Sequence, residues 1–225
     1  MTIQRALLLV GSAKPSGQSA SEALLTFLAK QLQAHGVETE LERVVHYSHR
    51  PEALFEAIER AELFVLASPV YIDALPYLVV QACERIAAHR QQLTAPDGKR
   101  FAAVVNCGFP ETAHCDTTLR IAKLFARDAE FEWAGGLGMG AGQPLSGHPV
   151  EDNFPHGRFA APALTQAAAA LAEGQAIPQR AVDLMATPTM PRFMYMMLGG
   201  SNWRKQAWDN GVLTQLHDKP YASEP

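Results

Sequence analysis

A loop rich in hydroxyl groups, residues 11–21, is the segment of this sequence best suited to bind a ligand. It holds four serines, two glycines and Lys14, and it directly precedes a predicted helix, whose first amides favour an anion. The dinucleotide pattern GxGxxG is absent, and the Walker pattern fails because Gln18 stands where its lysine belongs. The loop therefore suits a single phosphate. The alternative is a polar turn in which Ser19 or Ser21 caps the helix.

Two further loops offer apolar surface for a flat ring. In residues 68–76, Tyr71 lies between two prolines and next to aliphatic side chains. In residues 106–112, Gly108 allows the backbone to approach a ligand closely, and Phe109 adds a second apolar surface. In the alternative interpretation Tyr71 is an ordinary, partly buried side chain.

Other reactive side chains give weaker signals. Cys107 could act as a nucleophile with His114 nearby, although a small buried thiol is the simpler interpretation. His46 and His49 have no acidic or cysteine partner at metal-binding spacing, so we expect no metal site. In the long loop, Asp152 and His156 could touch a substrate or lie on a solvated loop.

Apolar runs and helix-period segments alternate along the first part of the chain. The predicted strands are residues 5–10, 37–45, 63–67, 101–105 and 131–137. The predicted helices cover about residues 19–35, 51–61, 76–92, 117–127 and 162–173. Because most of these strands are apolar without alternation, both faces of the sheet must be covered. We predict an α/β fold with a doubly wound five-stranded parallel sheet and helices on both faces.

This fold would bring the three loops together. They follow the first, third and fourth strands, and ligands bind beyond the carboxyl ends of such strands, where strand order reverses. The loop after the fifth strand, residues 138–157, is long and rich in Gly, Pro, Ser and His, which indicates a functional or partly mobile segment.

The amino-acid composition changes toward the C-terminal end of the chain. We assign residues 1–175 to the folded domain and residues 176–225 to a C-terminal extension. The extension holds a Met-rich and aromatic stretch, residues 193–198, followed by Trp203 and Trp208. Such apolar surface favours packing on the domain or on a second copy, so we expect a homodimer.

Composition excludes several function classes. The chain has 225 residues and a formal charge of −4, with no run of Lys and Arg, which argues against binding to nucleic acid. No window is apolar enough for a membrane span, and the N-terminus lacks the features of a signal peptide. Three cysteines, Cys83, Cys107 and Cys115, form no CxxC motif, and their odd number favours a reducing cytoplasm.

Together the three loops resemble the flavodoxin-like NAD(P)H-dependent oxidoreductases, the NADPH-dependent FMN reductase family, over about residues 5–137. The resemblance is strongest at Gly11-Ser12 with Gln18-Ser19, and at Ser-Pro-Val-Tyr within residues 61–76. It implies a flavodoxin-like fold and bound FMN. The residues it assigns to the phosphate are Ser12, Lys14, Gln18 and Ser19, and those it assigns to the ring are Pro69, Val70, Tyr71, Cys107, Gly108 and Phe109.

The implied activity is transfer of hydride from NADPH or NADH through FMN to a small electron acceptor, such as a quinone or free flavin. No catalytic side chain is assigned, because the flavin carries the chemistry. Ile72 and Asp73 depart from the family pattern, in which tryptophan or glycine often follows the tyrosine. A one-electron flavodoxin-type carrier, which the length and modest charge disfavour, and a scaffold that no longer binds FMN remain as alternatives.

Overall fold

The computed structural model describes residues 2–93 and 98–219, which divide into two compact units. The first unit ends at Thr189 and the second begins at Met190. Composition placed a boundary at residue 175. The first unit extends beyond it because α6 (Gln179–Ala186) packs on the helix before it and on the last strand.

Five parallel strands form the sheet of the first unit, in the order β2-β1-β3-β4-β5. Their bounds are Arg5–Val10 for β1, Glu38–Arg43 for β2, Leu63–Pro69 for β3, Arg100–Asn106 for β4 and Glu132–Met139 for β5. The order reverses between β1 and β3, which is the switch point of a flavodoxin-like sheet. The predicted fold, a flavodoxin-like doubly wound five-stranded parallel sheet, is confirmed.

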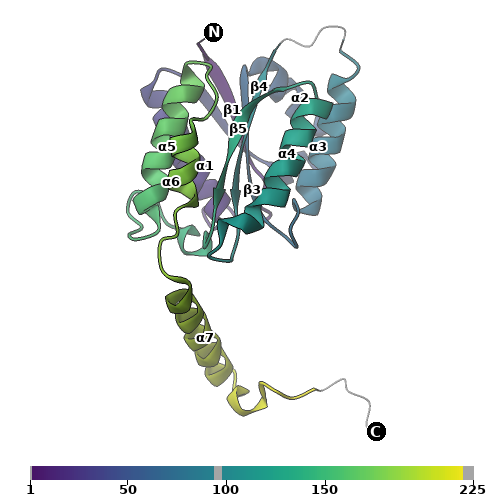
Figure 1. The fold of residues 1–225 in the computed structure, drawn as a ribbon. Helices are drawn as coiled ribbons and strands as arrows, with labels where there is room; N and C mark the ends of the chain where they lie inside the picture. Colours follow the sequence, from purple (N-terminus) through teal and green to yellow (C-terminus); the bar gives the residue numbers. More distant parts are fainter. Residues whose placement is uncertain (1, 94–97, 220–225) are drawn as a thin grey trace. The chain divides into compact units, whose positions relative to one another are not determined.

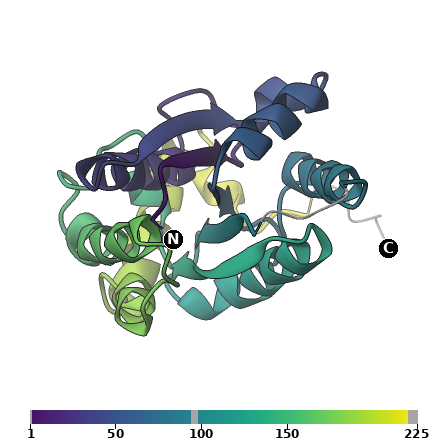
Figure 2. The ribbon, with the colours of Figure 1, turned by 90° about the horizontal axis from the view of Figure 1, so that it is seen from above.

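Helices cover both faces of the sheet (Figure 1). One layer is α1 (Ala20–Ala34), α5 (Gly157–Ala172) and α6, and the other is α2 (Pro51–Arg60), α3 (Tyr77–Arg90) and α4 (Asp116–Asp128). Figure 2 looks down on the sheet between these two layers. Along β1, Leu8 packs in the core on the α1 side, whereas Leu7 and Leu9 pack in the core on the α2 side. Burial on both faces explains why the strand is apolar at every position after Arg5.

Two elements begin or end at places that differ from the sequence prediction. The second strand ends at Arg43, because the chain then turns into a short 3-10 helix, η1 (Val44–Tyr47), that buries Val44 in the core. Helix α5 begins at Gly157, so that Pro162 lies inside the helix, where it cannot donate a backbone hydrogen bond. No side chain fits at Gly157, since a Cβ there would lie 1.7 Å from the carbonyl oxygen of Val150.

Two more 3-10 helices, η2 (Thr112–Cys115) and η3 (Gln143–Leu145), lie in the loops after β4 and β5. The second unit contains α7 (Arg192–Asp209) and the short η4 (Leu213–Gln215), where the sequence indicated only an apolar tail. Within residues 2–93 and 98–219, the structure holds no helix with the length and apolar character that crossing a membrane requires.

Candidate functional site

An open cavity of about 210 Å³ lies where the carboxyl ends of β1, β3 and β4 meet. The strands deliver their loops to one place because Val10 pairs with Ala67, and Pro69 pairs with Asn106, across the sheet. The residues that line the cavity are Ser12, Lys14, Ser19, Ala20, Ser21, Pro69, Val70, Tyr71, Asn106, Cys107, Gly108, Gln143 and Ser146.

The loop after β1 starts with a glycine that the packing requires. A Cβ at Gly11 would lie 2.7 Å from Cγ2 of Val79 and 2.9 Å from the carbonyl oxygen of Ala67. Ser12 follows, buried, and its Oγ accepts a hydrogen bond from the Lys14 amide at 3.3 Å. This contact curls the loop over the end of β1 and turns the Ser12 hydroxyl toward the cavity wall.

Ser19 ends the loop and caps α1. Its backbone is extended and its Oγ accepts a hydrogen bond from the Glu22 amide at 3.2 Å. Ser12 and Ser19 each use only an acceptor site in these contacts, so both hydroxyl hydrogens are left to donate to a ligand. The first turn of α1 adds amide groups with no partner inside the helix. This part of the cavity is therefore suited to an anion.

The outer part of the same loop, Ser16 and Gly17, is hydrogen-bonded to the carboxylate of Glu22. Glu22 accepts hydrogen bonds from the Ser16 hydroxyl and the Gly17 amide, each at 2.9 Å. The Glu22 side chain lines a neighbouring cavity on the other side of the loop. The anion site is therefore narrower than residues 11–21 as a whole and lies on the Ser12 and Ser19 side.

Arg43 contributes a cation that the sequence did not reveal. It ends β2, beside Val10 in the register of the sheet, and its guanidinium donates to the carbonyl oxygen of Lys14. Its Nε is buried and has no hydrogen-bond partner among the described residues. Arg43 thus anchors the Lys14 loop and adds positive charge behind it.

The loop after β3 is a tight hairpin at the rim of the cavity. The amide of Tyr71 donates to the Ala74 carbonyl at 2.9 Å, and the amide of Ala74 donates back at 3.1 Å. The two residues at the tip, Ile72 and Asp73, have φ of 51° and 58°, a left-handed conformation that β-branched side chains rarely adopt. Tyr71 lines the cavity with 49% of its surface exposed, as an open apolar wall would be.

The loop after β4 is tied to two neighbours. Asn106 Oδ1 accepts a buried hydrogen bond from the Ser21 hydroxyl at 2.8 Å, which links β4 to the first turn of α1. The Cys107 amide donates to Met139 at 3.0 Å, and its carbonyl accepts from Gly142 at 2.9 Å. These contacts clamp the Cys107 loop against the segment after β5.

Cys107 and Cys115 have unequal acidities. The neighbouring Cys115 thiol lowers the pKa of Cys107, and His114 acts in the same direction. The neighbouring Cys107 thiol, with burial, raises the pKa of Cys115. The Cys107 thiol donates to the carbonyl oxygen of Phe109 at 3.3 Å. The ring of His114 packs on Phe109, with 4.7 Å between ring centroids, rather than on the Cys107 sulfur.

The structure brings most of the predicted site residues together. Ser12, Lys14, Ser19, Pro69, Val70, Tyr71, Cys107 and Gly108 all line the cavity. Two do not. Gln18 is exposed on the outer side of the loop, and Phe109 is 62% exposed and turns toward His114.

Five residues that line the cavity were not predicted as site residues. Ala20 and Ser21 follow Ser19 in the same hydroxyl-rich segment, and Asn106 directly precedes Cys107, so neighbouring positions were their only signal. Gln143 and Ser146 belong to the long loop of residues 138–157, for which no specific role was predicted.

The other sequence candidates lie elsewhere. His46 Nδ1 is 3.5 Å from the Glu42 carboxylate, and no group of three potential metal ligands occurs within residues 2–93 and 98–219. His156 is buried with its Nδ1 3.3 Å from the Thr189 hydroxyl, and desolvation lowers its pKa. Asp152 is exposed.

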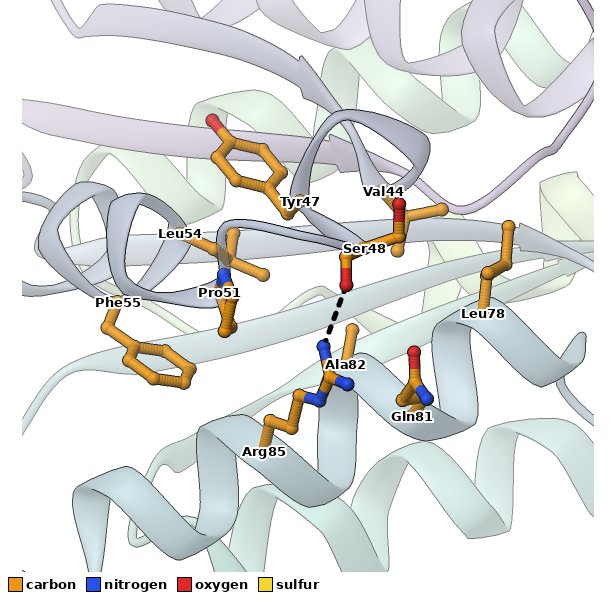
Figure 3. A pocket seen from close by; sticks show the side chains of 10 residues that line it. All are labelled: Val44, Tyr47, Ser48, Pro51, Leu54, Phe55, Leu78, Gln81, Ala82 and Arg85. Carbon is orange, nitrogen blue, oxygen red and sulfur yellow. Dashed lines mark hydrogen bonds between the residues drawn. The ribbon is translucent and has the colours of Figure 1, made fainter.

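A second crevice, between η1, α2 and α3, has room for little more than a water molecule. Its volume is about 10 Å³, and its walls include Val44, Leu54 and Leu78 (Figure 3). Arg85 closes one side by donating to the Ser48 carbonyl at 3.1 Å. It is a packing feature of the helical layer rather than a ligand site.

Comparisons with known proteins agree with this architecture. No protein-family model matches the chain, and no curated protein matches its sequence. A solved structure of a putative quinone reductase from Klebsiella pneumoniae has a TM-score of 0.56 at 14% identity, over 78% of this chain and 87% of that one. RosB with bound 8-demethyl-8-formylriboflavin-5'-phosphate has a TM-score of 0.54 at 14% identity, over 90% of this chain and 87% of that one.

Rubredoxin:oxygen oxidoreductase from Desulfovibrio gigas has a TM-score of 0.50 at 12% identity. That match covers 74% of this chain but only 36% of the larger protein. At such identities a structural likeness shows the fold alone. The chain therefore shares its flavodoxin-like fold with these three proteins.

Proposed function

We propose that this protein is an FMN-dependent oxidoreductase that takes hydride from NADPH or NADH and passes it to a small acceptor, such as a quinone or free flavin. The observation that carries the proposal is the cavity at the switch point, where an anion-binding loop and two ring-flanking loops meet. Fold neighbours that include a putative quinone reductase support the same class.

The residues present fit a flavin monophosphate. Ser12 and Ser19 have hydroxyl hydrogens left to donate, Lys14 supplies a positive charge, and Arg43 adds a second cation behind the loop. The hydroxyl and amide donors surround only one small anion site, which matches a single phosphate better than a chain of phosphates. Charge-assisted hydrogen bonds of this kind fix the position of a ligand as well as binding it.

The ring would lie against the other two loops. Pro69, Val70 and Tyr71 supply apolar surface on one side, and Cys107 with Gly108 forms the opposite edge. Bound FMN supplies the hydride chemistry. The side chains need only hold the phosphate, orient the ring and leave one face open to NAD(P)H and the acceptor in turn.

Flavin binding is the first test. The purified apo-protein is titrated with FMN, and quenching of flavin fluorescence gives the dissociation constant. We expect Ser19→Glu to abolish binding, because a carboxylate would replace the donor at the phosphate. Since Ser19 is buried, the exposed Lys14→Glu is measured as well, with an expected loss of at least tenfold, equivalent to about 1.4 kcal/mol.

The control matched to Ser19→Glu is Gln175→Glu, which adds the same single negative charge at an exposed position after α5, at the opposite end of the sheet. It should leave FMN affinity unchanged. Wild-type affinity in both loop variants would mean that the phosphate is placed wrongly, and failure of the wild type to bind FMN would favour the scaffold alternative.

The reaction is tested on FMN-loaded protein without oxygen. We expect NADPH or NADH to bleach the flavin absorbance and a quinone or free flavin to restore it. A protein that binds FMN but is reduced only by dithionite would be a one-electron carrier instead.

We also propose that the protein forms a homodimer through α7. On this helix Phe193, Met196 and Met197 recur at helical spacing and are exposed, as is Trp203 about two turns further along the same face. Exposed apolar stripes of this kind mark interaction surfaces. Phe193→Glu should convert a dimer into a monomer in sedimentation velocity, whereas Asn202→Glu on the opposite face should not. A monomeric wild type at micromolar concentration would contradict the proposal.

A further inference from the structure

Cys107 and Cys115 form a pair of free thiols at the end of the candidate flavin cavity. They pack with Val105 in one small apolar cluster. The carbonyl oxygen of Met139 contacts both residues, since it accepts the Cys107 amide at 3.0 Å and the Cys115 thiol at 3.6 Å. The Cys107 thiol itself donates to the carbonyl oxygen of Phe109 at 3.3 Å.

The pair has the asymmetry of a nucleophile and a resolving thiol. The neighbouring Cys115 thiol lowers the pKa of Cys107. The neighbouring Cys107 thiol, together with burial, raises the pKa of Cys115, which therefore keeps its proton. The thiolate is the reactive form of cysteine, so Cys107 is the sulfur expected to react first.

Access and room favour the same assignment. Cys107 lines the cavity of about 210 Å³, whereas Cys115 is fully buried behind it. The connecting segment starts at Gly108, where a Cβ would meet no heavy atom within 4 Å, so there is open space beside this glycine. The third cysteine, Cys83, lies in a separate core cluster, and burial raises its pKa to about 12.

We propose that Cys107 and Cys115 are an oxidisable dithiol that reacts with small hydroperoxides entering this cavity. The Cys107 thiolate attacks the O–O bond of the hydroperoxide ROOH, so that an S–O bond forms and the O–O bond breaks. The departing RO⁻ takes up a proton and leaves as ROH. Cys107 has then lost two electrons to the hydroperoxide and is a sulfenic acid.

Cys115 completes the reaction. Its sulfur attacks the Cys107 sulfur, the S–O bond breaks, and the hydroxide leaves as water with the Cys115 proton. A disulfide remains, with an S–S bond of about 2 Å. Because Cys107 is part of the cavity wall, closing this bond changes the wall on the side of Gly108.

The test uses the full chain without FMN, so its result is independent of the proposed flavin chemistry. Reduced protein is mixed with one equivalent of tert-butyl hydroperoxide. Free thiols are then counted under denaturing conditions, and disulfides are mapped by non-reducing digestion and mass spectrometry. We expect the wild type to keep one of its three thiols and to contain the Cys107–Cys115 link. The control Cys83→Ser should form the same link at the same rate.

The single variants separate the two steps. Cys115→Ser should stop at the sulfenic acid, which dimedone captures on Cys107, and Cys107→Ser should keep its remaining thiols reduced. If Cys115→Ser does not fold, Cys115→Ala replaces it. The proposal is overturned if Cys83 oxidises as fast as Cys107, if the disulfide joins two chains, or if Cys107 takes no dimedone without Cys115.

Discussion

The two ends of the sheet differ in whether their buried polar groups have hydrogen-bond partners within the protein. At the amino end, Arg90 is 1% exposed and donates to the carbonyl oxygen of Ala129 at 2.7 Å and to Glu59 at 2.9 Å. Lys99 donates to the Glu59 and Ala61 carbonyls at 2.8 and 3.0 Å. These buried cations are hydrogen-bonded to partners inside the protein, at the amino end of the layer formed by α2, α3 and α4.

At the carboxyl end, polar groups surround an open cavity instead. Ser12 and Ser19 have hydroxyl hydrogens left to donate, and Arg43 has a buried Nε without a partner among the described residues. Ile72, Asp73 and Ala141 hold the left-handed backbone conformation there. Hydrogen-bond donors without a partner and strained backbone conformations lower the stability of a protein. They are commonly found at ligand-binding sites. The buried cations at the amino end therefore contribute to stability, and the free donors at the carboxyl end lie where we propose that the ligand binds.

The largest expected effect is at the amino end. Arg90→Met removes the cation that satisfies two carbonyl oxygens and the Glu59 carboxylate, and should lower the free energy of unfolding by about 3 to 5 kcal/mol. Urea unfolding followed by circular dichroism measures this loss. FMN affinity of the folded variant should stay at the wild-type value, and weaker FMN binding without loss of stability would reverse the assignment of the two ends.

The next effect concerns the buried hydrogen bond between Ser21 and Asn106. Ser21→Ala leaves Asn106 Oδ1 without its donor and should cost about 1 to 3 kcal/mol. Asn106→Leu should cost a similar amount. In the double variant the losses should not add, because no unpaired polar group is left. Additive losses in a double-mutant cycle of chemical unfolding would show that the two side chains act independently.

This bond also shows what the sequence could and could not predict. Gly11, Ser12 and Ser19 were predictable because a glycine and hydroxyls directly after a buried strand are a local pattern. Arg43 was not, because its position beside Val10 depends on the register of β2, an edge strand of mixed composition. Ser21 and Asn106 are far apart in the chain and meet only once β4 lies next to α1.

The sequence also did not predict which side chains of the loops line the cavity. Gln18 and Phe109 occur in the predicted loops, yet neither lines the cavity. Gln18 is exposed, and the Phe109 ring packs on His114. Buried strands, by contrast, leave little choice of direction, and so the doubly wound five-stranded parallel sheet was predicted correctly.

A smaller, stabilising effect is expected at the rim of the cavity. Ile72 is 99% exposed with φ of 51°, so Ile72→Asn removes no packing and relieves backbone strain. The free energy of unfolding should rise by about 1 kcal/mol. Ile72→Val keeps the β-branched side chain and should give no gain. Equal stability of the two variants would mean that the hairpin carries no strain at this position.

The smallest expected effect depends on pH and concerns His156, which is buried just before α5. Desolvation lowers its pKa in the folded state from the usual 6.5. As the pH falls through 6.5, the unfolded chain binds a proton that the folded protein still excludes, so the free energy of unfolding falls and levels off below the folded pKa. His156→Gln cannot titrate and keeps a polar group near Thr189. The difference in stability between wild type and variant should therefore shrink or change sign as the pH falls from about 7 to 5. A difference that stays constant over this range would mean that the imidazole is hydrated in the folded state, and that the carboxyl end is open to water beyond the cavity itself.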